Sequence, residues 1–114
     1  MTSDRWVVST PLGHQVRLSE AAWVQKILVS HPELGTRPRH EDDLRLALEQ
    51  PDFVVEGWGG ALLSLRWCQD APHGGKHLCV VYRPGEPTGF VITAFFISRH
   101  GRLLRRPMRW EPRR

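Results

Sequence analysis

Four polar side chains in the second half of the chain are of types that act on a phosphodiester. Alternation along the predicted strands places them on one face of a sheet: Arg66, His77, Arg83 and Thr93. Imidazole exchanges protons near neutral pH, and guanidinium groups bind phosphate oxygens. Such a surface suits RNA cleavage without a metal, in which the adjacent 2′-hydroxyl attacks the phosphorus. We therefore take Arg66, His77 and Arg83 as candidate substrate-binding residues.

The sequence has no pattern typical of a metal or cofactor site. It contains no CxxC or HExxH motif and no Cys/His cluster, so we predict no metal and no cofactor. The acidic residues 41–43 follow the expected start of a helix, where carboxylates complement the helix dipole. We find no export signal, so Cys68 and Cys79 are expected to be buried thiols and not a disulfide.

Positive charge is concentrated at the C-terminal end. The chain of 114 residues has a net charge of +4. Residues 99–114 form an arginine-rich segment that contains one acid, Glu111, and these arginines: Arg99, Arg102, Arg105, Arg106, Arg109, Arg113 and Arg114. A cationic segment attracts phosphates, which favours contact with RNA. The alternative is a solvated tail that only aids solubility.

Two helices are predicted in the first half of the chain, over residues 19–30 and 40–50. Ser19 is a typical N-cap, and apolar residues follow it at helical spacing. Pro32 cannot continue a helix, so the first helix must end before it. Residues 1–18 are expected to form a short strand or an extended arm.

After residue 52 the pattern changes to the alternation typical of strands. Four strands are predicted, over residues 53–58, 62–68, 76–83 and 90–98, with Gly59-Gly60 as a two-residue hairpin turn. Short connections force neighbouring strands to be antiparallel. The predicted fold class is α+β, with two N-terminal helices packed on one face of a roughly four-stranded antiparallel meander sheet. We expect a single domain over residues 1–114, with the other sheet face free for a partner.

Several short motifs occur in an order that resembles one nuclease family. The first helix ends in His31-Pro-Glu, the second in Pro51-Asp52, and the last main strand carries Thr93-Ala-Phe. Over about residues 19–97 the chain resembles the phage-type branch of the barnase–EndoU–colicin–RelE (BECR) nuclease superfold. The resemblance implies an enzyme, a metal-independent endoribonuclease of the toxin or phage-associated effector kind.

The resemblance also implies roles for three residues. His31 matches the histidine of the His-Pro-Glu motif and would be the general base or acid. Thr93 would bind the scissile phosphate, and Lys76, at the start of a strand where members tend to carry a basic residue, would neutralise phosphate. The match does not identify a second acid or base. The alternative for His31 is interaction with the last carbonyls of its helix.

Other functions remain open beside the nuclease. One is a non-catalytic RNA-binding or protein-interaction module of the same fold, and another is an antitoxin-like or scaffold protein whose arginines dock on an acidic partner. An active nuclease would need an inhibitor, and an acidic antitoxin protein would match a basic site.

The sequence predicts no membrane association. No apolar run reaches the roughly 20 residues of a membrane span. The N-terminus has Asp4 and Arg5 in place of an apolar secretory segment. We therefore expect a cytoplasmic protein, or one delivered into the cytoplasm of a target cell.

Overall fold

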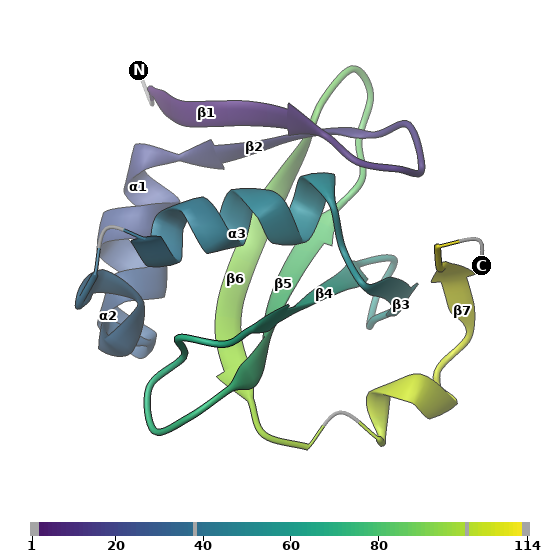
Figure 1. Cartoon of the computed structure of the whole chain (residues 1–114). Coiled ribbons are helices and arrows are strands. Elements are labelled where there is room, and N and C mark those ends of the chain that lie inside the picture. The colour runs from purple at the N-terminus through teal and green to yellow at the C-terminus, as the bar shows by residue number, and fades with distance from the viewer. Residues whose placement is uncertain (1–2, 38, 100, 113–114) are drawn as a thin grey trace.

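The computed structural model describes residues 3–37, 39–99 and 101–112 (Figure 1). The helical elements are α1 (Glu20–Ala22), η1 (Trp23–Ile27), α2 (Leu28–Ser30), η2 (Pro32–Gly35), α3 (Arg39–Glu49) and η3 (Leu103–Arg105). The strands are β1 (Asp4–Ser9), β2 (Gln15–Ser19), β3 (Phe53–Glu56), β4 (Leu62–Cys68), β5 (Lys76–Arg83), β6 (Gly89–Ile97) and β7 (Met108–Trp110).

The strands form one seven-stranded mixed sheet in the order β1-β2-β6-β5-β4-β3-β7. Neighbours are antiparallel except β2 and β6, which pair in parallel through Val16 with Gly89 and Arg17 with Phe90. The predicted four-stranded antiparallel meander with two N-terminal helices is therefore wrong. Two strands precede the helices: β1 and β2 form a hairpin that joins the sheet through the pairing of β2 with β6, and β7 pairs with the distant β3 (Figure 1).

The positions predicted for individual strands agree with the structure better than the predicted fold class does. Strands at 62–68 and 76–83 are confirmed, and the last main strand is displaced by one residue. The predicted two-residue hairpin turn is wrong, because the link between β3 and β4 spans residues 57–61. The Gly57 amide donates to the Ala61 carbonyl at 2.8 Å and closes this turn.

The first helical segment is continuous from residue 20 to residue 30, with the π-helical turn η1 between α1 and α2. The Ser19 side chain accepts a hydrogen bond from the Ala22 amide at 3.1 Å, which confirms it as the N-cap. The segment ends at His31, whose φ of −135° is not helical, directly before Pro32. Its C-terminal end therefore places the His31 imidazole at the sheet.

Side chains of β4 satisfy the C-terminal carbonyls of α3. Pro51 has no amide to donate to the Ala47 carbonyl, and the buried Ser64 hydroxyl donates to it at 2.5 Å. Arg66 Nη1 donates to the Gln50 carbonyl at 2.6 Å, where a cation also complements the helix dipole. These bonds fix α3 on the sheet.

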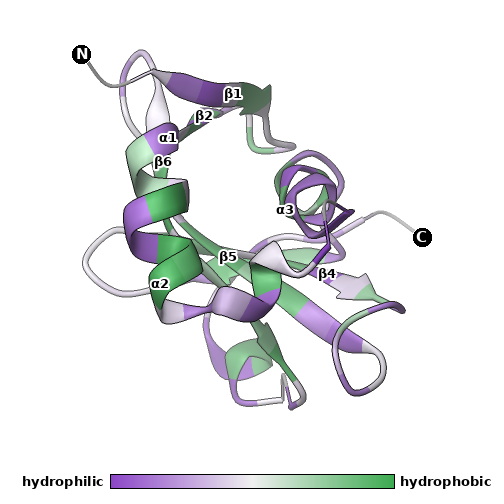
Figure 2. Ribbon diagram, turned by 90° about the vertical axis from the view of Figure 1, so that its left-hand side faces the viewer, coloured by the Kyte–Doolittle hydropathy of each residue, from purple (hydrophilic) through white to green (hydrophobic). Residues whose placement is uncertain are grey.

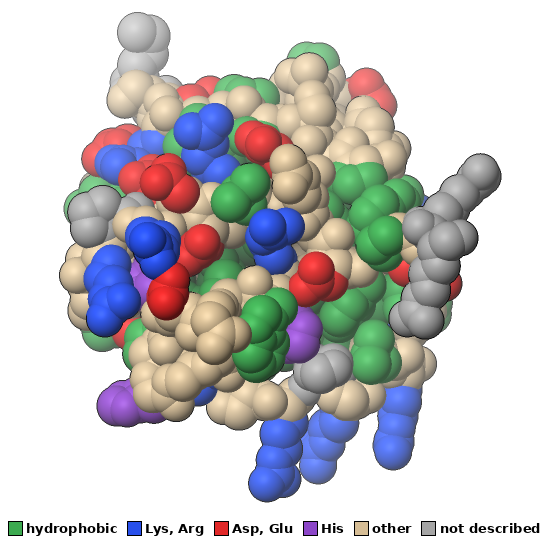
Figure 3. All heavy atoms as spheres, viewed as in Figure 1, with side chains coloured by type: hydrophobic (Ala, Val, Ile, Leu, Met, Phe, Trp, Pro, Cys, Tyr) green, Lys and Arg blue, Asp and Glu red, His purple; other side chains and the backbone are tan. Residues whose placement is uncertain are grey.

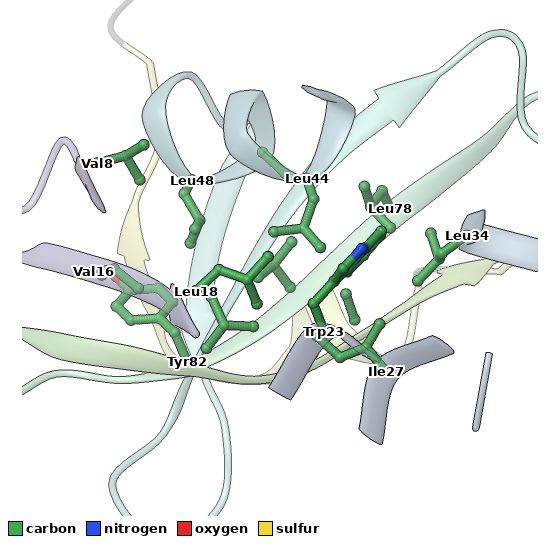
Figure 4. Packing of buried hydrophobic residues seen from close by; sticks show 14 of the residues in the cluster. Val8, Val16, Leu18, Trp23, Ile27, Leu34, Leu44, Leu48, Leu78 and Tyr82 are labelled. Carbon is green, nitrogen blue, oxygen red and sulfur yellow. The ribbon is translucent and has the colours of Figure 1, made fainter. Parts of the chain in front are cut away.

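The sheet separates two apolar clusters, one on each face. The helices cover the first face, and Figure 4 shows the side chains that meet there from α3, η1, β2 and β5. Its largest buried members are Leu18, Trp23, Ile27, Leu34, Leu44, Leu48, Leu78 and Tyr82. We call this side the helix face.

The opposite side, which we call the second face, carries its own buried cluster: Phe53, Val55, Ala61, Leu63, Leu65, Cys79 and Val81. Leu103 of η3 packs against this cluster, because the C-terminal segment folds back beneath the sheet (Figure 2). The expectation that this face is free for a partner is therefore wrong over its centre. Along β6 the side chains of this face are half-buried, and Trp67 at one end of the face and Phe90 at the other are exposed.

Both cysteines are free and buried, as the sequence predicts. Cys68 belongs to the helix-face cluster and Cys79 to the second-face cluster, so the sheet separates the two sulfurs. Burial raises the pKa of each thiol to about 12.

The backbone has a radius of gyration of 13.2 Å, close to the ~13 Å of a compact domain of 100 residues. Within the described ranges, no helix has the length and apolar character needed to cross a bilayer.

Candidate functional site

The register between β4 and β5 divides the predicted polar surface. Arg66 lies opposite Leu78, a helix-face residue, so Arg66 also lies on the helix face. The prediction that it shares a face with His77 and Thr93 is therefore wrong. Its guanidinium binds the Gln50 carbonyl at the end of α3, which gives Arg66 a capping role.

Lys76 is also separated from Thr93. It lies opposite Cys68 on the helix face, at the start of β5. The β5 partner of Thr93 is Val81, five residues further on and roughly 16 Å along the strand. Lys76 and Thr93 therefore do not reach the same phosphate.

Three of the predicted residues do share the second face, at different points along it. The pairs are His77 with Ile97, Val81 with Thr93, and Arg83 with Phe90. One extra residue, Ile92, forms a bulge between Thr93 and Val91, and it moves Val91 into the helix-face cluster. Thr93 thus lies between His77 at one end of the face and Arg83 at the other.

The His77 imidazole is enclosed by aromatic rings. Its ring centroid is 5.2 Å from that of Trp67 and 6.0 Å from that of Phe53. Its Nε2 atom is 4.0 Å from the Asp52 carboxylate, which also accepts a hydrogen bond from the Trp67 amide at 2.6 Å. These contacts hold His77 at the end of β5, away from Thr93, and favour a structural role for it.

His31 reaches β6 at Phe95, two residues from Thr93. β2 pairs with β6 only through Gly89 and Phe90, and the helical segment containing η1 packs beside β6 (Figure 1). The His31 ring centroid is 5.7 Å from that of Phe95. Phe95 follows Thr93 on the same face, about 7 Å along the strand. His31 and Thr93, distant in sequence, therefore lie at one edge, which we call the β6 edge.

The His31 side chain is accessible to a ligand. It is 32% exposed, and its Nδ1 atom lies 3.5 Å from the Glu33 carboxylate. A carboxylate on one ring nitrogen orients the imidazole and leaves the other nitrogen for proton exchange. This arrangement differs from a histidine that only caps its helix.

Three exposed arginines gather just beyond the end of β6. Arg99, Arg102 and Arg105, with Gly101, line a surface hollow of about 560 Å³. Basic side chains project below the sheet in Figure 3, on the side where η3 lies in Figure 1. Within the described residues, none of these three forms an ion pair with a carboxylate. We call this hollow the arginine pocket.

The other arginines of the C-terminal segment have different surroundings. Arg106 stacks on Trp58 with its guanidinium 4.3 Å from the ring centroid, and Arg109 lies 3.4 Å from Glu56. Arg113 and Arg114 lie outside the described residues. The segment is therefore partly an ordered covering of the sheet and partly a source of unpaired positive charge, and not only a solvated tail.

The β6 edge carries the His31 imidazole and the Thr93 hydroxyl, and the arginine pocket lies beyond the C-terminal end of β6. Sequence reasoning named His31 and Thr93, but gave Phe95 only as the aromatic residue of a motif. The sequence offers Trp58 as a residue that could stack on a base, but not its contact with Arg106, which forms only when β7 returns to β3. No local pattern indicates that contact.

Across the part of the chain that the structure describes, no three His, Cys, Asp or Glu side chains are placed to hold a metal ion. Comparison with family models, with curated proteins and with solved structures gives no match.

Proposed function

We propose that this protein is a metal-independent endoribonuclease in which His31 exchanges a proton and Thr93 contacts the scissile phosphate. One observation carries the proposal: the two residues that the sequence motifs single out lie at the same edge of β6. The Phe95 ring, on the face of Thr93, is 5.7 Å from the His31 ring.

The reaction is attack of a ribose 2′-hydroxyl on the adjacent phosphorus. The new bond joins the 2′-oxygen to phosphorus, and the bond to the 5′-oxygen breaks, which leaves a 2′,3′-cyclic phosphate and a 5′-hydroxyl. His31 removes the 2′-proton or protonates the leaving oxygen. Because Lys76 is distant, we assign neutralisation of the phosphate to Arg83, which lies about 7 Å from Thr93 along the same face.

The test is cleavage of end-labelled RNA in EDTA by the wild type and by His31→Ala. A general acid or base contributes about 10²- to 10⁴-fold, so His31→Ala should lose at least about 100-fold in rate. The matched control is His73→Asn, an exposed histidine whose φ of 61° asparagine tolerates. Equal rates for His31→Ala and the wild type would refute the proposal.

A second candidate is RNA binding without cleavage. The position of Lys76 on the helix face favours it, because the edge then lacks one of the cations expected from the resemblance. In that case the wild type and His31→Ala both retain RNA without cutting it. Phosphate contacts would show as affinity that falls steeply with salt concentration.

The partner we propose in addition to RNA is an acidic inhibitor protein. The arginine pocket offers three unpaired guanidinium groups to its carboxylates. Such a partner should bind more weakly as the salt concentration rises.

A further inference from the structure

Trp58 is 62% exposed, more than any other Trp, Phe or Tyr side chain among the described residues. It lies in the 57–61 turn at the end of β3, where the Ala61 amide donates to the Trp58 carbonyl at 3.0 Å. A large apolar ring that faces water in an ordered turn is available to a ligand.

Arg106 fixes one side of the Trp58 ring. Its Nε donates a hydrogen bond to the Glu56 carbonyl. Its Nη2 donates to the Gly57 carbonyl at 2.8 Å. The guanidinium carbon is 4.3 Å from the indole centroid. Since carbonyls hold the cation on one side, the ring is pre-positioned with its other side toward solvent.

Arg83 approaches the same turn from β5. Its Nη1 donates to the Gly59 carbonyl, and a Cβ at Gly60 would lie 3.3 Å from that nitrogen. The φ of Gly60 is +85°, so glycine suits both the turn and the approach of the guanidinium. This contact extends positive charge from Trp58 to the second face.

Phe90 continues the surface on β6. It is 43% exposed and lies between its two strand neighbours, Arg83 on β5 and Arg17 on β2. We name the set the aromatic–arginine surface: Arg17, Trp58, Arg83, Phe90 and Arg106. Of the nearby acids, Glu56 pairs with Arg109 and Glu86 lies in the turn between β5 and β6.

We propose that the aromatic–arginine surface binds single-stranded RNA by stacking bases on Trp58 and Phe90, and this rests on the proposed nuclease function. Exposed aromatic faces among guanidinium groups suit unpaired bases joined by phosphates. Arg83 lies two residues beyond Val81, the partner of Thr93, so it is about 7 Å along the same face. The surface therefore holds nucleotides that flank the phosphate at Thr93.

The test measures binding separately from cleavage. A fluorescent single-stranded RNA with 2′-O-methyl groups throughout has no free 2′-hydroxyl, so it binds without being cut. Stacking contributes ~1–3 kcal/mol per base, so Trp58→Ala should weaken binding by roughly 5- to 150-fold. Trp58→Phe should retain most of the affinity, because it keeps an aromatic face. Arg83→Gln should lower the slope of log affinity against log salt by about 0.7.

The matched control is Arg45→Gln, which removes another exposed arginine that lies over a tryptophan, Trp6, at 5.9 Å. It should bind the probe as the wild type does. Wild-type affinity in Trp58→Ala would overturn the stacking proposal, and so would absence of probe binding by the wild type. Tryptophan and arginine are also frequent in protein–protein interfaces. Unchanged RNA binding in Trp58→Ala would therefore favour a protein partner for this surface. Failure of the nuclease proposal appears separately, as unchanged cleavage by His31→Ala.

Discussion

The Ser64 hydroxyl makes a quantitative prediction about how α3 is held on the sheet. It donates to the Ala47 carbonyl at 2.5 Å, and Pro51 removes the amide that would otherwise bond there. Ser64 is 1% exposed and Ala47 is fully buried, so water does not replace the lost donor. Ser64→Ala therefore leaves a buried carbonyl unpaired, which costs about 1–3 kcal/mol of unfolding free energy.

Urea unfolding of Ser64→Ala and the wild type measures this cost. The midpoint should fall without a change in the denaturant slope, and the melting temperature should fall by roughly 4–12 °C. Ser9→Ala is the control, because it makes the same substitution at an exposed strand position. A loss in Ser64→Ala as small as that of the control would refute the capping role of Ser64.

Two further predictions concern charged and reactive groups. The Arg5 guanidinium holds the pKa of Glu41 below its ordinary value of 4.5, so the stability from this pair is present above pH 4.5 and is lost as the pH falls further. Glu41→Gln should have a lower unfolding free energy than the wild type at pH 7, and urea unfolding should show that this difference shrinks as the pH falls below 4.5. A difference that does not change with pH would contradict this prediction. Cys68 and Cys79, with pKa values of about 12, should react with a thiol reagent at pH 8 only after denaturant is added, and rapid labelling of the native protein would contradict their burial.

Local signals in the sequence were sufficient for several elements, but not for the separate strands β1, β2 and β7 or for how the strands pair. The N-cap at Ser19 and the alternation over 62–68 depend on neighbouring residues, and both predictions are confirmed. The parallel pairing of Val16 with Gly89 joins distant segments, and nothing in either segment identifies the other. The predicted meander failed for that reason.

The candidate site was predictable to a similar extent. Strand alternation correctly placed His77, Arg83 and Thr93 on one face. It failed for Arg66, because the actual register places that residue opposite Leu78 on the helix face. The covering of the second face by Leu103 was also missed, since a tail rich in arginine gives little sign that it folds back on a sheet.

The most direct test of the central claim is the mass of the products from an RNA strand with one ordinary ribose among 2′-O-methyl nucleotides. If His31 serves the 2′-hydroxyl reaction, the wild type in EDTA should give one 5′-fragment that ends in a 2′,3′-cyclic phosphate, and His31→Ala should leave the strand intact. An uncut strand with the wild type, fragments with other ends, or equal cleavage by both proteins would contradict the account.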